Sequence, residues 1–273
     1  MDITAAPILV TGGTGTLGRH VVPLLREAGR EVRVLSRHAH EPADGVSYVA
    51  CDLRTGEGLD AAVAGVGTVL HLAGGPKGDD EATRNLVRAA QDAGVRHLVY
   101  ISVIGADRVP LAWLRSKLAA ERAITESGIP WTTLRAAQFH DLALLMAQKM
   151  AKLPVIPAPG GLRMQPVDAR EVAARLVELT LGEPAGLVPD LAGPEVYSLA
   201  ELLRTYLTAH GKRRPMLPVR MPGKAGHAYR SGANLTLEGA EKGTRSWKEF
   251  LAERMEEATG ATTGNQVARN RAA

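Results

Sequence analysis

The sequence predicts an α/β protein built on a Rossmann-type, doubly wound parallel sheet, with a smaller lobe formed by the C-terminal part of the chain. Two observations carry this prediction. Short apolar runs alternate with segments of helical periodicity from residue 8 to about residue 151, which is typical of βαβ units with right-handed crossovers. Beyond that point the alternation stops, and prolines and glycines become frequent.

The expected strands are short and rich in Val, Ile or Leu, as strands buried on both faces of a parallel sheet are. They are Ile8–Thr11, Val32–Leu35, Ser47–Ala50, Thr68–His71, His97–Ile101 and Thr132–Leu134. The helices expected between them are Leu17–Glu27, Asp80–Ala93, Leu111–Glu126 and Asp141–Ala151. Gly29 and Gly94 stand at the ends of the first two helices, and glycine is a common stop signal there.

The C-terminal part begins with a predicted loop over 154–161, where three prolines and two glycines cluster. Helices are predicted at Ala169–Leu181, Leu199–Ala209 and Ser246–Ala258, the last two with Ser198 and Ser246 as N-caps. Glu249 stands at the capping-box position of the last helix. No element is assigned over 211–244. The expected division is a Rossmann domain at 1–155, an interleaved lobe at 156–259 and a polar tail at 260–273.

Composition excludes several classes of protein. The 273 residues are 45% hydrophobic and 23% charged, which fits a globular chain, and no run of 18 apolar residues could form a membrane span. Cys51 is the one cysteine, so neither a disulfide framework nor a cysteine-based zinc site is expected. His38, His40 and Glu41 lie together but have no third ligand at helical spacing, so no metal is predicted.

Charge and aromatic content bear on partners. The net charge is +4, with the basic excess scattered over 201–273, and only 4% of residues are aromatic. Basic residues are not interleaved with aromatic ones, so no nucleic-acid partner is predicted. No basic leader precedes the first apolar run, so a cytoplasmic protein is expected. The expected oligomeric state is a monomer or a homodimer.

The strongest motif is the glycine-rich turn after the first strand. Its glycines, Gly12, Gly15 and Gly18, lie between an apolar strand and an apolar-periodic helix. Small residues let the backbone approach a pyrophosphate, and the helix N-terminus offers N–H donors and the positive end of its dipole. We therefore predict that this turn binds a dinucleotide through Thr11, Gly12, Thr14, Gly15, Thr16, Leu17 and Gly18.

The ends of the next strands predict which dinucleotide binds. Ser36 and Arg37 stand where a carboxylate would bind the ribose 2′-hydroxyl of NAD, and an arginine there can pair with the 2′-phosphate of NADP. NADP(H) is therefore favoured over NAD(H). Asp52, with Leu53 beside it, is expected at the adenine. Small residues Ala73 and Gly74, after the fourth strand, would let the backbone lie against the cofactor.

These motifs resemble a known family. TGGTGTLG, CDL after the third strand, LHLAG at the fourth and YIS at the fifth are similar to the short-chain dehydrogenase/reductases. SKLAAE at 116–121, SGIPWTTLRAAQFHD at 127–141, QPVDAREVA at 165–173 and GTRSWKEFLA at 243–252 resemble the atypical, NmrA-like NAD(P)H-binding group. The resemblance covers about residues 8–255. It implies an NAD(P)-binding domain followed by a C-terminal substrate lobe.

The sequence departs from this family at one catalytic position. The usual catalytic motif of this family is Tyr-x-x-x-Lys on the helix after the fifth strand, where the two side chains lie on one face of the helix. Here Lys117 is present, but Trp113 holds the tyrosine position, and an indole N–H is no useful acid near neutral pH. The resemblance implies that Lys117 holds the nicotinamide ribose. Lys117 is also a candidate acid/base, as in isoflavone-reductase-like proteins.

Other side chains are candidates for the reaction and the substrate. Ser102 follows the fifth strand, and Gln138, Phe139 and His140 follow the sixth, at the carboxyl edge where parallel sheets bind ligands. Ser102 and His140 are catalytic candidates in addition to Lys117. Gln138, Phe139 and His140 are expected to line the substrate pocket, and Trp113 to stack on an aromatic substrate.

The sequence thus predicts an NADP(H)-dependent oxidoreductase that moves a hydride to or from a small apolar molecule, such as a quinone or an aromatic or enone carbonyl. Two alternatives stay open because the tyrosine is replaced. One is a sensor that binds NADP(H) and a protein partner without chemistry. The other is an isomerase, lyase or cyclase of secondary metabolism that keeps the fold but not the hydride transfer.

Overall fold

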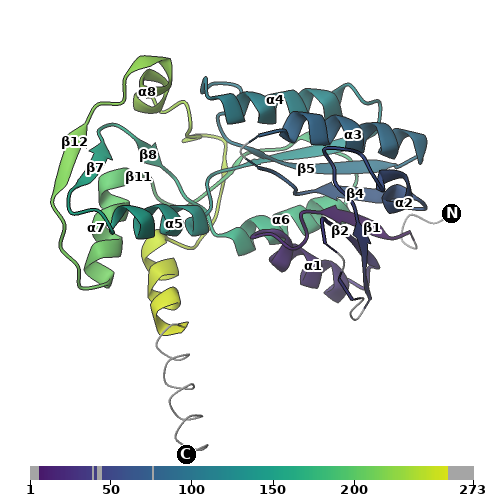
Figure 1. Cartoon of the computed structure of the whole chain (residues 1–273), viewed down its shortest axis with the longest axis horizontal. Coiled ribbons are helices and arrows are strands. Elements are labelled where there is room, and N and C mark those ends of the chain that lie inside the picture. The colour runs from purple at the N-terminus through teal and green to yellow at the C-terminus, as the bar shows by residue number, and fades with distance from the viewer. Residues whose placement is uncertain (1–5, 39, 42–44, 76, 258–273) are drawn as a thin grey trace, which may run out of the picture.

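The computed structural model describes residues 6–38, 40–41, 45–75 and 77–257. Its main feature there is a nine-stranded parallel sheet in the order β13-β10-β6-β5-β4-β1-β2-β3, with β9 paired to β6 (Figure 1). The strands are β1 (Ile8–Thr11), β2 (Val32–Ser36), β3 (Val46–Ala50), β4 (Thr68–His71), β5 (His97–Val103), β6 (Trp131–Ala136), β9 (Gly186–Leu187), β10 (Leu191–Ala192) and β13 (Glu241–Lys242). The order 3-2-1-4-5-6 confirms the predicted Rossmann-type fold.

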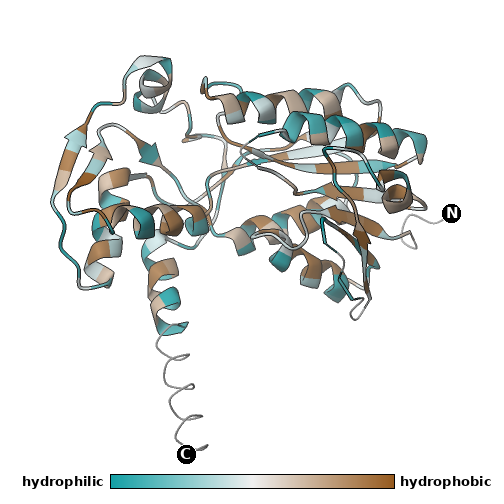
Figure 2. Ribbon diagram, in the orientation of Figure 1, coloured by the Kyte–Doolittle hydropathy of each residue, from teal (hydrophilic) through white to brown (hydrophobic). Residues whose placement is uncertain are grey.

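Helices cover both faces of the sheet because its strands are apolar on both. Along β1, Ile8 and Val10 face one core and Leu9 faces the other. Brown, apolar ribbon accordingly runs along the strands and the inner sides of the helices in Figure 2. One face carries α1 (Gly18–Glu27) and α6 (Ala169–Leu181), and the other carries α2 (Leu59–Val63), α3 (Asp79–Asp92) and α4 (Ala112–Thr125).

The second lobe has its own apolar core. It contains α5 (His140–Met150), α7 (Leu199–Ala209), α8 (Gly223–Arg230) and a helix over 247–257. Two small sheets complete the lobe: β7 (Ile156–Pro159) runs parallel to β12 (Met216–Val219), and β8 (Arg163–Met164) antiparallel to β11 (Tyr197–Ser198). The expectation of a loop over 154–161 was therefore wrong at β7. A two-stranded ribbon tolerates prolines that a central strand would not.

The final helix is fixed by apolar anchors and a cap. Trp247, Phe250 and Leu251 are buried in the lobe core, as the sequence pattern predicts. Ser246 and Glu249 form the predicted capping box, in which the Ser246 N–H donates to the Glu249 carboxylate at 2.7 Å and the Glu249 N–H donates to Ser246 Oγ at 3.3 Å.

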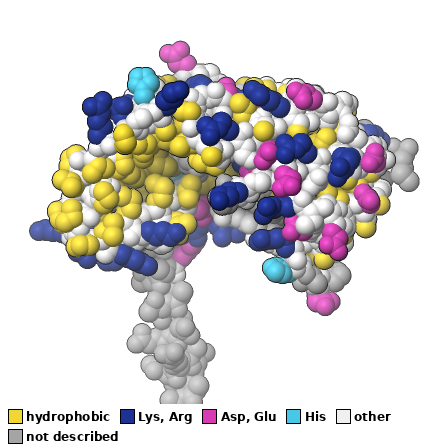
Figure 3. Space-filling view, turned by 45° about the horizontal axis from the view of Figure 1, so that its top comes forward, with side chains coloured by type: hydrophobic (Ala, Val, Ile, Leu, Met, Phe, Trp, Pro, Cys, Tyr) yellow, Lys and Arg dark blue, Asp and Glu magenta, His cyan; other side chains and the backbone are white. Residues whose placement is uncertain are grey.

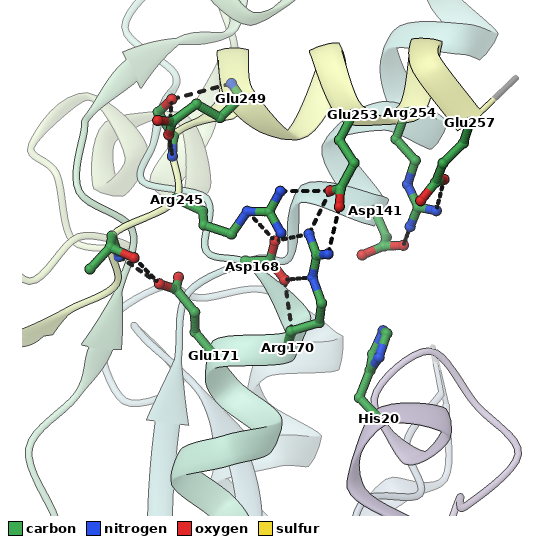
Figure 4. A network of polar contacts seen from close by, with 12 residues as sticks. His20, Asp141, Asp168, Arg170, Glu171, Arg245, Glu249, Glu253, Arg254 and Glu257 are labelled. Carbon is green, nitrogen blue, oxygen red and sulfur yellow. Dashed lines mark hydrogen bonds and ion pairs between the residues drawn. The ribbon is translucent and has the colours of Figure 1, made fainter. Parts of the chain in front are cut away.

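Charged residues hold the same helix against α5 and α6 (Figure 4). The buried Asp168 carboxylate pairs with Arg170 and Arg245, and both arginines also reach Glu253, at 2.7 and 2.6 Å. Arg254 reaches Asp141, the second residue of α5, at 3.3 Å. Asp141 in turn binds Arg19 of α1 at 2.9 Å, so the cluster joins the two parts of the molecule.

The chain passes between the two parts repeatedly. After β6 it enters the second lobe through α5, returns as α6 to cover the sheet, and later adds β10 and β13 at the sheet edge. The predicted division at residue 155 remains a prediction, and the predicted tail over 260–273 lies outside the described residues. Within the described part, no helix is both long and apolar enough to span a membrane.

Candidate functional site

The glycine-rich turn between β1 and α1 has the geometry of a phosphate cradle. Gly12 has φ +68°, and a Cβ on it would lie 2.8 Å from the backbone nitrogen of Ala73. A Cβ on Gly18 would lie 2.4 Å from the Gly12 carbonyl oxygen. Both glycines are therefore required by close backbone contacts. No side chain caps the start of α1. The N–H groups of Arg19 and Val21 donate to the carbonyls of Gly15 and Leu17, so an anion would be bound by N–H groups of the turn that precedes them.

A buried hydrogen-bond network fixes this turn to the loop after β4. Thr11 Oγ1 accepts the N–H groups of Leu72 and Ala73, at 3.2 and 3.1 Å, and lies 2.7 Å from His71 Nδ1. Thr83 Oγ1 donates to the Asp79 carbonyl, so it accepts from His71 Nε2 at 3.0 Å. Burial, aided by the charge of Lys117, lowers the pKa of His71 to about 3, so the ring is neutral. Thr11 thus shapes the site from behind it.

A cavity of about 740 Å³ opens beside these loops. Its wall includes Gly12 and residues 14–17 of the turn, Ser36 and Arg37, residues 51–54, residues 72–75, and Ser102, Lys117, Gln138 and Phe139. Most of the predicted site residues are therefore brought together at the carboxyl ends of β1 to β6. The exceptions are Thr11 and Gly18, which lie behind the turn, and Trp113 and His140.

Trp113 and His140 are packed away from the cavity wall. Trp113 is half-buried against the apolar cluster of Ala106, Val109, Leu114 and Ala228. His140 is fully buried, with its ring 5.0 Å from the Phe250 ring and 5.9 Å from that of Trp247. Burial lowers its pKa, although nearby carboxylates act in the opposite direction. In this structure, His140 contributes to the core of the second lobe.

One end of the cavity is basic and solvent-exposed. Arg37 follows β2 and Arg54 follows β3, and both are exposed side chains of the wall. Asp52 Oδ1 accepts the N–H of Arg54 at 2.9 Å, which holds the loop after β3. Arg54 was not among the predicted site residues, and its Nε lies 4.0 Å from Glu81 Oε2 of α3. Cys51 also lines the cavity, but burial raises the pKa of its thiol to about 11, so it stays protonated.

At the other end, Lys117 forms a buried ion pair. Its Nζ lies 3.0 Å from Asp79 Oδ2, and the two side chains are 10% and 7% exposed. The second Asp79 oxygen, Oδ1, accepts the N–H of Gly75 at 2.7 Å. A Cβ on Gly74 would lie 2.8 Å from Lys117 Nζ, so a larger residue there would displace the end of the lysine side chain. Asp79 was not predicted from the sequence, where it resembles an ordinary acidic residue at a helix start.

Ser102 belongs to a second buried network. Its hydroxyl donates to Glu121 Oε1, and Glu121 receives two hydrogen bonds from Arg135, at 2.9 and 2.7 Å. Arg135 also reaches Asp107 at 3.0 Å. Because the Ser102 proton is directed at Glu121, the oxygen presents acceptor lone pairs to the cavity. Glu121 lies one helical turn after Lys117 on the same face of α4, but it is not part of the cavity wall.

The surroundings of the cavity differ between the two lobes. Phe139 and Leu142 form its wall on the second lobe, where Leu145, Leu153, Val155 and Leu217 are also exposed. Figure 3 shows a hollow in this face, with apolar side chains gathered on the second lobe and Lys and Arg side chains across the Rossmann half. No group of three or more potential metal ligands occurs in the described ranges.

The residues present fit a dinucleotide. Gly12 lets the turn pack directly against the loop after β4, no side chain caps the start of α1, and Arg37 and Arg54 are exposed side chains of the same cavity wall. When bound, a reduced nicotinamide would supply a hydride. The chain's own residues would bind the phosphates and ribose, and present Lys117 and the Ser102 acceptor near the reacting ring.

Comparison with known proteins agrees with this fit. NAD(P)H azoreductase of Xenophilus azovorans is 33% identical over 215 residues, covering 75% of this chain and 74% of the relative. (4-Alkanoyl-5-oxo-2,5-dihydrofuran-3-yl)methyl phosphate reductase of Streptomyces griseus is 33% identical over 201 residues, covering 71% and 70%. The solved NADPH complex of an Escherichia coli NADPH-dependent quinone oxidoreductase superposes with a TM-score of 0.77 at 20% identity, over 91% of this chain and 99% of that one.

A family match defines the group. Residues 12–180 match the family described as NAD(P)H-binding, and this segment runs from the glycine-rich turn that follows β1 to the end of α6, of which it lacks only Leu181. The similar reductases support an NAD(P)H-dependent oxidoreductase at the level of the general activity. The chain belongs to the NAD(P)H-binding family.

Proposed function

We propose that this protein is an NADPH-dependent oxidoreductase that reduces a small, largely apolar, conjugated acceptor such as a quinone or an aromatic or enone carbonyl. The observation that carries the proposal is the continuity of the cavity. One wall contains the phosphate turn and Lys117, and the same cavity continues to Phe139 and Leu142 on the apolar side of the second lobe. A cofactor and an apolar molecule could therefore share it.

The basic end supports NADPH over NADH. No carboxylate stands at Ser36 or Arg37, and the Ser36 hydroxyl is engaged by the N–H of His38 at 3.2 Å and by His40 Nε2 at 3.0 Å. Arg37 and Arg54 are then the charged groups suited to a 2′-phosphate, because guanidinium groups bind phosphate with two parallel hydrogen bonds.

We assign to Lys117 the donation of the proton that the reduced acceptor needs. Its ammonium lines the cavity beside the Asp79 carboxylate. Trp113 stands four residues before it and has no proton to give near neutral pH. Lys117 would hold the ribose and donate a proton to the anion that hydride transfer creates. The reductases similar to this chain are named for azo, oxo-dihydrofuran and quinone substrates, which are conjugated acceptors.

The test is a nucleotide titration followed by turnover. Purified protein should bind NADPH more tightly than NADH and consume it with at least one member of a panel of quinones, azo dyes and enones. Lys117→Ala should lose turnover while keeping its fold. NADPH binding with no turnover on the whole panel would favour a cofactor sensor, which the replacement of tyrosine by Trp113 also allows. Failure to bind either nucleotide would contradict the proposal.

A further inference from the structure

The Asp79–Lys117 pair stands out among the buried charges of the described chain. Four Asp, Glu, Lys or Arg residues are buried there: Asp79, Lys117, Glu121 and Asp168. Asp79 and Lys117 line the cavity, whereas Glu121 and Asp168 lie behind its wall. Glu121 is held by Arg135 and Asp168 by Arg170. At this end of the cavity, the buried charged groups in the wall are therefore one carboxylate, Asp79, and one ammonium, Lys117.

Two buried neighbours of the pair, Tyr100 and His71, are neutral. The Tyr100 ring lies under Lys117, with Nζ 5.3 Å from its centroid, and burial raises the pKa of its hydroxyl well above the ordinary value. His71 is neutral for the reason given above. Lys77 also lines the cavity, but as an exposed side chain that water screens. Asp79 and Lys117 thus set the local electrostatic balance.

The two oxidation states of a nicotinamide differ in charge at the ring. The oxidised ring is a cation and the reduced ring is neutral, while the rest of the nucleotide is unchanged. A lone buried ammonium would therefore disfavour the oxidised form selectively, and a lone carboxylate would favour it. We propose that Asp79 sets the preference of this site for the cofactor's oxidation state, because its carboxylate offsets the Lys117 ammonium beside the nicotinamide subsite. The inference rests on the proposed NADPH function.

The geometry fixes Asp79 for this role. Its Oδ1 is held by the Gly75 N–H, and its Oδ2 is held by Lys117, so the carboxylate cannot rotate away without losing both partners. Gly74 leaves no side chain between the pair and the cavity. Two charges separated by several ångström near a protein surface still interact, and water at the open side of the cavity weakens this interaction. A selective effect of about three- to tenfold is expected.

The experiment measures dissociation constants for NADPH and NADP⁺ by calorimetry, without any substrate. In Asp79→Asn the ratio of the NADP⁺ constant to the NADPH constant should rise about three- to tenfold. In Lys117→Met the ratio should fall, even though loss of the ribose contact weakens both nucleotides. The double variant should return towards the wild-type ratio. Asp80→Asn, a carboxylate-to-amide change in the same helical turn outside the cavity wall, should leave the ratio unchanged.

These outcomes separate an electrostatic role from a structural one. If Asp79 merely anchors the loop at Gly75, its substitution weakens both nucleotides equally and the ratio stays constant, which overturns the inference. Shifts of the same sign in the two single variants also overturn it. If Asp79→Asn does not fold, the direction of the Lys117→Met shift decides. If the wild-type protein binds both nucleotides but the ratio is the same in the variants, only this inference is contradicted. If the wild-type protein binds neither nucleotide, the proposed function is contradicted as well.

Discussion

Gly12 and Ala73 are in such close contact that a Cβ on the glycine would lie 2.8 Å from the Ala73 backbone nitrogen. This contact joins the phosphate turn after β1 to the loop after β4. The Gly12 carbonyl also accepts the Gly15 N–H at 3.0 Å, so Gly12 both closes its own turn and contacts the other loop. The shape of the cofactor site therefore depends on two loops that are distant in the sequence.

Gly12→Ala should weaken NADPH binding by at least about tenfold, a loss of 1.4 kcal/mol or more. The added methyl group must push the two loops apart, and φ +68° strains any residue with a Cβ. Gly29→Ala is the matched control, because Gly29 has φ +72° with no atom near the added Cβ. Gly29→Ala should lower stability but keep the affinity. Calorimetry and thermal unfolding measure both, and unchanged affinity in Gly12→Ala would contradict the assignment of the turn.

Arg37→Ala and Arg54→Ala should each raise the dissociation constant for NADPH by about tenfold and leave that for NADH nearly unchanged. Each removes a charge-assisted hydrogen bond worth about 1.5–3 kcal/mol to a 2′-phosphate. Arg88→Ala is a suitable control, since Arg88 is an exposed residue of α3 outside the cavity wall. Equal losses for the two nucleotides would place the arginines away from the 2′-phosphate.

Glu121→Ala should destabilise the fold by about 3 kcal/mol, because it leaves Arg135 without its bidentate partner and the Ser102 hydroxyl without an acceptor. Glu178→Ala removes an ion pair with Arg175 in which the glutamate side chain is 69% exposed, and it should change stability by less than about 1 kcal/mol. Urea unfolding compares the two. Similar small effects would show that the Ser102–Glu121–Arg135 network contributes little.

Stability should fall as the pH decreases from about 6.5 towards 4. Burial lowers the pKa of His71 to about 3 and that of His97 to about 4, and it also lowers that of His140. Below 6.5 the unfolded chain binds protons at these histidines that the folded chain excludes, so acid favours unfolding. Each histidine contributes a loss of about 1.4 kcal/mol per pH unit until its folded pKa is reached.

Urea unfolding at a series of pH values measures this slope. His97→Gln should reduce it by the share of one histidine, because a glutamine can still bond to Thr132 Oγ1, which lies 2.9 Å from His97 Nε2, but does not titrate. A free energy of unfolding that is constant over this range would show that the buried histidines are protonated without cost.

The sequence predicted the Rossmann sheet well because its strands are continuous apolar runs. All six expected strands occur, and β2, β5 and β6 extend further, to Ser36, Val103 and Ala136. The missed strands β7 and β12 contain Pro157, Pro159 and Pro218, which a pattern-based prediction takes as signs of a loop. The short β9, β10 and β13 have too few residues to show any periodicity.

The site divides in a similar way. The phosphate turn is a local motif, so its residues are contiguous in the sequence and in space. Asp79 and Glu121 act through partners on other elements, Lys117 and Arg135, and no spacing rule connects them. Trp113 was expected at the substrate because helical spacing places it near Lys117. Its large ring instead packs on the cluster that includes Ala228 of α8, an element that the sequence did not reveal.

The repeated passage of the chain between its two parts limits how such a protein can be altered. A shorter chain ending at residue 155 would lack α6, and with it part of the cover that α1 and α6 together give to the face of the sheet at Ile8 and Val10. The second lobe therefore cannot be exchanged at this point between relatives without exposing an apolar face of the sheet. On the proposed function, new specificity is expected to arise in place, through substitutions in the second lobe, while the same chain keeps the nucleotide half intact.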